Sequence, residues 1–187
     1  MRIITGTARG VRLETLDGDD ITRPTGEKVK EALFSMIQFE IDGARVLDVF
    51  SGSGQLALEA LSRGASYAVM GDVSPEAVAV IRKNALKTKL AGNTRILNVD
   101  YKTLIKGLEK REKFNIVFLD PPYNTDLLHD SLKLIAEREV RSDILAPNAI
   151  VICESDSPEP KACEGLVQRR FAKYGRVFVT VLENPAQ

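Results

Sequence analysis

The chain has 187 residues, of which 44% are hydrophobic and 28% are charged, so it is long enough to bury the core of one globular domain. Its 26 basic and 26 acidic side chains balance, which excludes a protein that coats nucleic acid by charge alone. The sequence shows neither a signal-peptide pattern nor an apolar run of the roughly 20 residues that span a bilayer. We therefore expect a cytoplasmic protein.

The N-terminal region divides into an extended segment and a helix. Residues 2–16 alternate apolar and polar side chains around Gly6 and Gly10, which predicts a β-hairpin, and residues 17–20 are predicted to form a turn. Apolar residues then recur at helical spacing, so residues 26–38 are predicted to form an amphipathic helix.

From residue 44 onward, short apolar runs alternate with helical segments. Strands are predicted at 45–50, 67–72, 94–99, 115–119 and 149–154, and helices at 55–63, from 74, at 103–110 and at 126–138. Strands this apolar imply a mostly parallel sheet with helices on both faces, an α/β fold. Two final strands, 166–172 and 176–182, have no helix between them. They predict a C-terminal antiparallel hairpin that completes a seven-stranded sheet.

A glycine-rich turn follows the first of these strands. Gly52 and Gly54, two residues apart, let the backbone pass close to a bound cofactor, and phosphate binding is the rival interpretation. Ala57 stands where a dinucleotide fingerprint usually has its third glycine. Asp48, at the strand end, would repel a pyrophosphate but favour a cationic ammonium or sulfonium group.

Acidic residues end the first three strands of the predicted sheet. Asp72 is placed to accept both hydroxyls of a ribose, and Asp100 can accept a hydrogen bond from an exocyclic amine such as that of adenine. Ligands of open α/β sheets bind beyond the carboxyl ends of the strands. Together with Asp48, these acids predict S-adenosylmethionine as the ligand.

The fourth strand is followed by Asp120-Pro121-Pro122-Tyr123. The prolines fix the backbone and remove amide donors, so the loop presents carbonyl oxygens, and Pro122 holds Pro121 extended. The Asp120 carboxylate and the Pro121 carbonyl can accept hydrogen bonds from both protons of an amino group. Tyr123 offers an aromatic face on which a planar base can stack.

This loop, together with Asp48-x-Phe50-x-Gly52-x-Gly54, resembles the class I methyltransferases that modify exocyclic amines of bases or of glutamine. Three further segments are similar to the RsmD-type enzymes, which methylate N2 of a guanine in 16S ribosomal RNA. They are MRIITG at 1–6, TRPT at 22–25 followed by VKEALF at 29–34, and LEALSRGA at 58–65. The resemblance covers essentially the whole chain.

The resemblance implies a Rossmann-like methyltransferase domain at 25–187 and an N-terminal β-hairpin extension at 1–24 that contacts RNA. It implies a target-amine site at Asp120, Pro121, Pro122 and Tyr123. It assigns the S-adenosylmethionine site to Asp48, Phe50, Gly52, Gly54, Asp72, Val73, Asp100 and Tyr101. The chain departs from the family pattern in one place, where Gly71 and Asp72 stand at positions that relatives usually fill with Val and Glu.

Basic residues gather near both ends of the chain. The first thirteen residues contain Arg2, Arg9 and Arg12 and no acid, so we expect the extension to bind RNA. Arg23 either contacts RNA or belongs to a segment, 22–25, that covers the methionine end of the cofactor. The second basic run carries five cations and one acid between residues 161 and 176. A solvated surface is the alternative interpretation of both runs.

The sequence thus predicts methyl transfer to a guanine N2 amine of 16S ribosomal RNA, within a small-subunit particle, by a monomer. No metal is expected, because a sulfonium already activates its methyl group. Cys153 and Cys163 lack zinc-site spacing, and His129 adds little, so we expect two free thiols, buried or half-buried.

Three rival functions remain open. A DNA adenine-N6 methyltransferase, or another amine methyltransferase of this type, can use the same loop, but no separate target-recognition domain is evident. A protein-glutamine methyltransferase more often has Asn in place of Asp120. A non-enzymatic RNA-binding protein would not need the strand-end acids.

Overall fold

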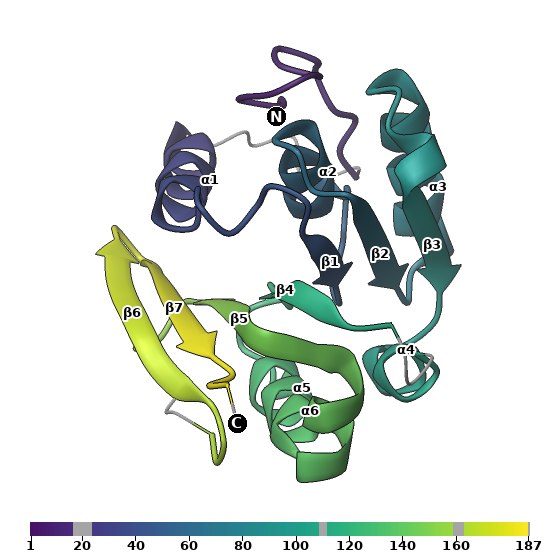
Figure 1. Cartoon of the computed structure of the whole chain (residues 1–187). Helices are drawn as coiled ribbons and strands as arrows, with labels where there is room; N and C mark the ends of the chain where they lie inside the picture. Colours follow the sequence, from purple (N-terminus) through teal and green to yellow (C-terminus); the bar gives the residue numbers. More distant parts are fainter. Residues whose placement is uncertain (17–23, 109–111, 159–162, 187) are drawn as a thin grey trace.

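Seven strands form one sheet in the order β3-β2-β1-β4-β5-β7-β6 in the computed structural model, which describes residues 1–16, 24–108, 112–158 and 163–186 (Figure 1). Strands β1 to β5 are parallel to one another, whereas β7 is antiparallel to both β5 and β6. The predicted α/β fold and its C-terminal hairpin are confirmed. The strands are β1 (Arg45–Asp48), β2 (Tyr67–Asp72), β3 (Thr94–Asn98), β4 (Phe114–Leu119), β5 (Leu145–Ser155), β6 (Val167–Tyr174) and β7 (Val177–Glu183).

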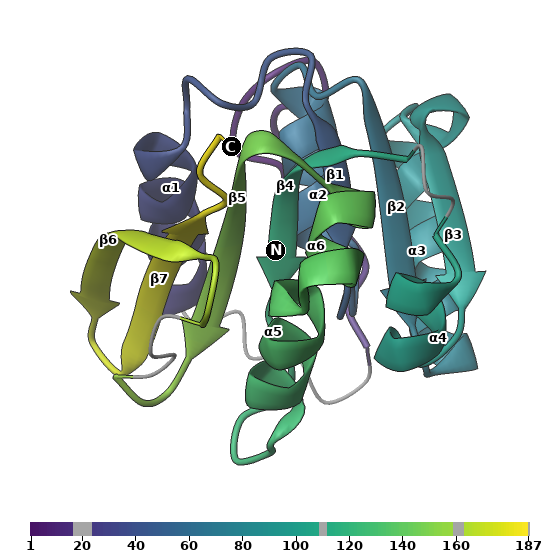
Figure 2. The same ribbon diagram turned by 60° about the horizontal axis from the view of Figure 1, so that its bottom comes forward.

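Helices cover both faces of this sheet, as Figures 1 and 2 show. The first face carries α1 (Pro24–Met36), α2 (Gln55–Ser62) and α3 (Pro75–Lys87). The second carries α4 (Tyr101–Lys106), α5 (Leu127–Ala136) and α6 (Arg138–Ile144). A short 3-10 helix, Ala91–Asn93, precedes β3. None of the helices within the described ranges is both long and apolar enough to cross a membrane.

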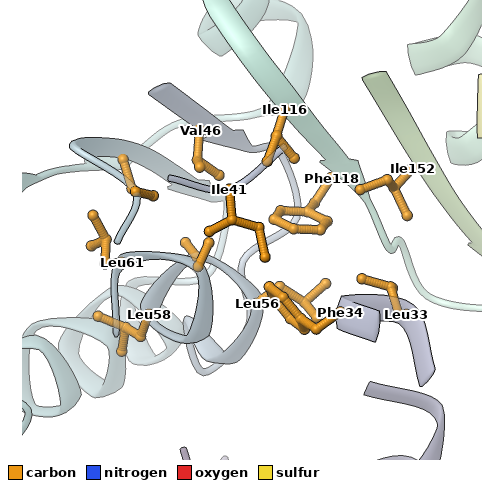
Figure 3. Close-up of a cluster of buried hydrophobic side chains, with 14 of the residues drawn as sticks. Leu33, Phe34, Ile41, Val46, Leu56, Leu58, Leu61, Ile116, Phe118 and Ile152 are labelled. Atoms are coloured by element: carbon orange, nitrogen blue, oxygen red, sulfur yellow. The ribbon is translucent and has the colours of Figure 1, made fainter. Parts of the chain in front are cut away.

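The alternation of side chains along each buried strand builds two hydrophobic cores. On β4, Ile116 and Phe118 pack toward α1 and α2, whereas Val117 and Leu119 pack toward α4 and α5. Figure 3 shows the first core, where the rings of Phe34 and Phe118 lie 5.9 Å apart between centroids. Truncating such a buried aromatic ring to alanine costs about 3–5 kcal/mol.

Several element boundaries differ from the sequence prediction by one or two residues, and three differences are informative. The helix predicted at 126–138 ends at Ala136, because the chain leaves helical geometry at Glu137, where no glycine or proline signals the break, and α6, which was not predicted, follows directly. Strand β5 begins at Leu145, since it pairs with Phe114 before Pro147 and the left-handed Asn148 interrupt its register. Helix α4 begins two residues earlier than expected, at Tyr101.

The predicted N-terminal hairpin is reduced to one antiparallel bridge between Arg2 and Arg12, and the segment between them is a series of turns. The turn predicted at 17–20 lies outside the described residues. Ile3, Ala8 and Leu13 are buried in the first core, so the segment packs against the domain rather than standing apart from it.

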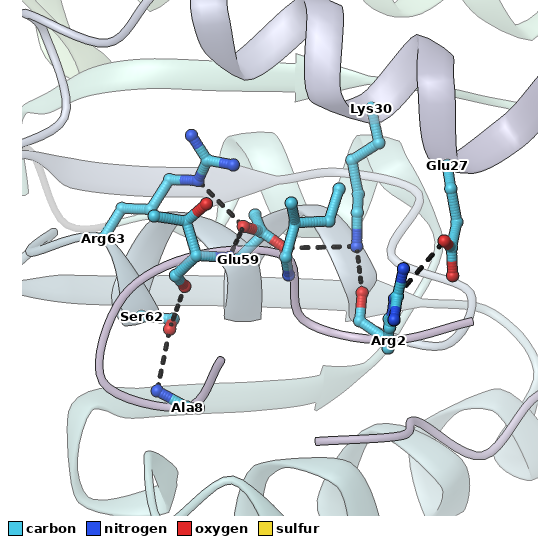
Figure 4. A network of polar contacts seen from close by, with 9 residues as sticks. Arg2, Ala8, Glu27, Lys30, Glu59, Ser62 and Arg63 are labelled. Atoms are coloured by element: carbon cyan, nitrogen blue, oxygen red, sulfur yellow. Dashed lines mark hydrogen bonds and ion pairs between the residues drawn. The ribbon is translucent and has the colours of Figure 1, made fainter. Parts of the chain in front are cut away.

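A buried carboxylate on α2 fixes this segment in place (Figure 4). Glu59, which is fully buried, accepts the backbone N–H of Ile4 at 2.8 Å and that of Thr5 at 3.0 Å. Its oxygens also lie 2.8 Å from Nε of Arg63 and 3.2 Å from Nζ of Lys30. One side chain therefore ties α1, α2 and the first residues together.

Lys30 depends on the same carboxylate. Its side chain is 3% exposed, and its ammonium donates to the backbone oxygen of Arg2 at 2.7 Å. Burial lowers the pKa of Lys30, while the charge of Glu59 acts in the opposite direction. Removing one partner of a buried pair leaves the other charge uncompensated, which is more costly than losing a surface pair.

We expect Glu59→Gln to lower the free energy of unfolding by about 3–5 kcal/mol, because Lys30 and Arg63 then lose their buried counter-charge. Urea denaturation at pH 7 measures this change.

Glu27→Gln is the matched control, since Glu27 pairs with Arg2 at 3.4 Å with both side chains more than one-third exposed. That variant should lose no more than about 1 kcal/mol. Equal losses in the two variants would contradict the assigned role of Glu59.

Candidate functional site

A cavity of about 750 Å³ opens where five parallel strands end, a size typical of small-molecule sites. Segments that follow β1, β2, β3 and β4 line it, together with the end of β5. Ten residues predicted for the cofactor or the target amine lie around it: Phe50, Gly52, Asp72, Val73, Asp100, Tyr101, Asp120, Pro121, Pro122 and Tyr123. Leu16, Ser74 and Leu127, which were not predicted, complete the wall with other residues.

Asp48 ends β1 directly before Val49 and Phe50, which line this cavity, and it is 1% exposed. Within the described part of the chain, neither of its carboxylate oxygens accepts a hydrogen bond of normal geometry. Burial raises the pKa of Asp48 to about 7, and the nearby charge of Asp72 acts in the same direction, while weaker contacts with the backbone of Ala57 and the side chain of Ser51 oppose the rise. A buried carboxylate with so few polar partners is stabilised by a nearby cation. This agrees with the sequence prediction that Asp48 favours a cationic ammonium or sulfonium group.

The glycine turn is tied to the next strand by Asp72. Its Oδ2 accepts the backbone N–H of Gly52 at 2.9 Å, and its Oδ1 accepts that of Ser74 at 2.9 Å. A carboxylate oxygen has capacity for a second hydrogen bond, so Asp72 can also accept ribose hydroxyls. The shorter side chain at this position therefore still reaches the turn.

Two glycines near Asp72 have structural roles. Gly54 does not line the cavity; it adopts φ 77° at the start of α2. A Cβ at Gly54 would also lie only 3.2 Å from Ile81. At Gly71, a Cβ would lie 2.4 Å from Cδ2 of Leu104, so the departure from valine makes room for that leucine.

Asp100 lies at the edge of the cavity with its carboxylate already in use. It caps α4 by accepting the backbone N–H groups of Lys102 and Thr103 at 2.9 and 3.0 Å, and the Thr103 hydroxyl at 2.6 Å. These bonds lower the pKa of Asp100 and keep it ionised. Contact between Asp100 and adenine stays a prediction. The role of Asp100 as the cap of α4 was not predicted from the sequence.

Aromatic and apolar groups complete this part of the wall. The rings of Phe50 and Tyr101 lie 5.8 Å apart between centroids, at an angle of 40°. Val73 is 70% exposed although it is apolar, which suits a residue that a planar ligand covers.

Tyr123, the last residue of the Asp120–Tyr123 loop, lines both the first cavity and a second one of about 670 Å³, whereas Asp120, Pro121 and Pro122 line only the first of the two. Asp120 is half-buried, and its withdrawal from water, reinforced by the charges of Glu154 and Asp48, raises its pKa well above the usual range. Pro121 is buried, whereas Tyr123 is 43% exposed and donates its hydroxyl to Oε1 of Glu154 at 2.9 Å.

Glu154 is a site residue that the sequence analysis missed. It lies at the end of β5 and lines both cavities. The signal was available, because Glu154 is an acid at the carboxyl end of a predicted strand, like Asp48 and Asp72.

Three of the candidate RNA-binding arginines, Arg2, Arg9 and Arg12, line neither cavity. Arg9 and Arg12 are exposed on the N-terminal segment, and Arg2 is exposed but paired with Glu27. Arg23 and Thr22 lie outside the described residues. The chain nevertheless links this segment to the cavities, since Met1 lines the second and Leu16 lines the first.

Cys153 is buried and Cys163 half-buried, and both thiols are free, as predicted. Burial raises the pKa of both thiols, so neither is activated as a nucleophile.

The residues around the first cavity fit S-adenosylmethionine. The unpartnered Asp48 carboxylate suits a positively charged ligand, Asp72 suits a ribose, and the exposed Val73 suits an adenine face. Each of these observations matches a different part of the same ligand.

Solved structures share this fold over nearly the whole chain. The protein yhhF of Escherichia coli is 33% identical, with a TM-score of 0.85, and the match covers 100% of this chain and 99% of that one. The protein HI0767 of Haemophilus influenzae is 28% identical, with a TM-score of 0.79 and coverage of 99% and 98%.

The matches to sequence relatives cover most of the length of each relative. YlbH of Bacillus subtilis, provisionally named an rRNA methyltransferase, is 35% identical over 184 residues, 97% of either chain. Ribosomal RNA small subunit methyltransferase D of Escherichia coli K12 is 36% identical over 156 residues, 83% of this chain and 75% of the relative.

A family model described as "Conserved hypothetical protein 95" matches residues 1–183. This match covers both the N-terminal segment and the sheet, as does the match to YlbH. The chain therefore belongs to this family, that of the RsmD-type S-adenosylmethionine-dependent methyltransferases.

Proposed function

We propose that this protein transfers a methyl group from S-adenosylmethionine to the exocyclic N2 amine of a guanine in 16S ribosomal RNA. The observation that carries the proposal is the Asp120–Tyr123 loop, which lines a cavity suited to the cofactor and reaches, through Tyr123, a second cavity large enough for a base. The relatives named for small-subunit ribosomal RNA support the choice of substrate.

The residues of this loop place and polarise the amine. An exocyclic purine amine shares its lone pair with the ring and is a poor nucleophile. The Asp120 carboxylate and the Pro121 carbonyl accept its two protons, which favours the pyramidal form and stabilises the charge that develops on nitrogen. Pro122 keeps Pro121 extended, and the Tyr123 ring stacks on the base.

Bound S-adenosylmethionine would supply a methyl group already activated by its sulfonium. Transfer of that methyl group from the sulfonium to N2 would leave the nitrogen with one proton too many. Asp120 is suited to accept that proton transiently, because its pKa lies well above the usual carboxyl range. Solvent then takes the proton from Asp120.

The N-terminal extension, residues 1–24, is proposed as the RNA-contacting part, attached to a catalytic domain at 25–187. Its exposed Arg9 and Arg12 lie on the segment that Glu59 fixes to α2. A guanine must leave its stack to reach Tyr123, and phosphate contacts from these arginines would hold the RNA in that conformation. We propose that the protein is a cytoplasmic monomer and meets its RNA within a small-subunit particle.

Transfer of a tritiated methyl group to separated ribosomal RNAs and subunits, followed by mapping of the modified base, tests the function. In this assay we expect Asp120→Ala to lower the transfer rate by about 10²–10³-fold, because the amine loses its charged acceptor. Affinity for S-adenosylmethionine should stay within a few-fold.

Asp120→Asn is the matched control, since it retains an acceptor oxygen and should lose less activity than Asp120→Ala. A near-normal rate in Asp120→Ala would contradict the proposed role. Methylation at a position other than guanine N2 would overturn the proposed function.

The ionised carboxylate of Asp48 should lower the free energy of unfolding of the protein without cofactor, although it favours cofactor binding. Its pKa of about 7 in the folded state lies above the ordinary value of 3.8, so the destabilisation grows as pH rises from about 4 and is complete above 7. We expect Asp48→Asn to raise the free energy of unfolding at pH 8 by about 2–4 kcal/mol, with little change at pH 4.

The same variant should bind S-adenosylmethionine at least about 10-fold more weakly, because one favourable charge interaction is lost. Urea denaturation at the two pH values and calorimetric titration of the cofactor measure both effects. Unchanged affinity would separate Asp48 from the cofactor site.

RNA binding by the extension has its own test. Arg9→Ala combined with Arg12→Ala should weaken binding to 16S ribosomal RNA and flatten the slope of log K against log salt by about 1.5, since each lost phosphate contact contributes about 0.7–0.9. Arg82→Ala with Lys87→Ala, two exposed cations of α3, is the control. A slope equal to that of the wild type would place the RNA site elsewhere.

A further inference from the structure

The side chain of Glu154 lies at the junction of the site's cavities. Glu154 and Tyr123 both line the first cavity, the second cavity and a smaller one of about 160 Å³ beside the Asp120–Tyr123 loop. The backbone of Glu154 is held by the sheet, since Glu154 pairs with Val179 of β7 and the preceding Cys153 also pairs with Leu119 of β4. A base that enters the second cavity with its amine toward the cofactor must therefore pass beside this carboxylate.

The orientation of the Glu154 carboxylate is fixed by one strong contact. The Tyr123 hydroxyl donates to Oε1 at 2.9 Å, while no hydrogen bond to Oε2 is recorded from the described residues. Glu154 is half-buried, and burial raises its pKa. An N–H donor on a ligand can satisfy Oε2 and would favour the ionised carboxylate.

The pattern of donors on guanine matches this arrangement. Its N1–H lies next to its N2 amino group on the same edge of the ring, so two adjacent positions are donors. If Asp120 and the Pro121 carbonyl hold N2, the neighbouring N1–H faces the next acceptor along the cavity wall. Adenine has an unprotonated N1, whose lone pair would meet the carboxylate with repulsion.

We infer that Glu154 is a specificity-determining residue, which selects guanine by accepting a hydrogen bond from N1–H while Tyr123 holds its carboxylate in position. This inference rests on the proposed function and names the contact by which the site would distinguish guanine from adenine.

Other acids of the second cavity are less suited to this role. Asp156 is exposed, so water competes for its carboxylate, and Glu27 is paired with Arg2 on α1. Only Glu154 among these three acids also lines the first cavity, where methyl transfer must take place.

The test compares two target bases that both carry the N2 amine. 2-Aminopurine keeps this amine but has an unprotonated N1, so it replaces the mapped guanine in the RNA, alone or within the small-subunit particle. We expect wild-type kcat/KM to fall by at least about 100-fold on this substrate, because a site built for an N–H rejects an analogue that lacks it.

The variant Glu154→Gln tests the role of Glu154 more directly than the comparison of the two bases with the wild type. Its amide oxygen can still accept the Tyr123 hydroxyl, which leaves the amide N–H group to face N1 of the base. We expect a loss of at least about 10-fold on guanine and a gain on 2-aminopurine, so that the preference for guanine disappears or reverses. Affinity for S-adenosylmethionine should remain within a few-fold, which shows that the site is intact.

Asp156→Asn is the matched control and should keep the wild-type preference for guanine. If Glu154→Gln loses activity but keeps that preference, Glu154 acts only by holding Tyr123, and the inference is overturned. If the wild type transfers no methyl group to guanine N2, the proposed function fails instead, whatever Glu154 does.

Discussion

The buried carboxylate of Glu59 connects the parts of this protein that form the proposed RNA and cofactor sites. It lies on α2, the helix that begins directly after the glycine turn, and it binds backbone amides of the N-terminal segment and the Lys30 ammonium of α1. The N-terminal segment therefore has a fixed position relative to the turn. The places of Met1 and Leu16 in the walls of the two cavities depend on this anchoring.

A second buried carboxylate, that of Asp48, shows the opposite arrangement only eleven positions earlier in the chain. Glu59 has four charged or amide partners, whereas the Asp48 carboxylate accepts no hydrogen bond of normal geometry within the described residues. The first arrangement stabilises the fold, and the second makes the free protein less stable near neutral pH. This contrast separates an acid with a structural role from one that we propose to pair with a cationic ligand. Burial also raises the pKa of Asp120 and of Glu154, at the ends of the next two strands.

Local patterns in the sequence account for the sheet and for most of the site. The strands are apolar enough to be recognised as buried, and acids at their ends, such as Asp72 and Asp100, mark the ligand-binding edge. The break at Glu137 was not predictable, because no glycine or proline marks it. The role of Asp100 as a helix cap was hidden because a capping acid and a ligand-binding acid look alike in sequence.

The sequence was sufficient for the family, for the order and type of most elements, and for most of the residues around the first cavity, because these depend on periodicity and on short contiguous motifs. Three properties required the folded structure: how the N-terminal segment is anchored, which acids have partners, and that Glu154 receives the Tyr123 hydroxyl. The Ile4–Glu59 and Tyr123–Glu154 contacts, for example, join residues that are 55 and 31 positions apart. Their burial and pairing arise only when the sheet brings those residues together, and no local pattern encodes that.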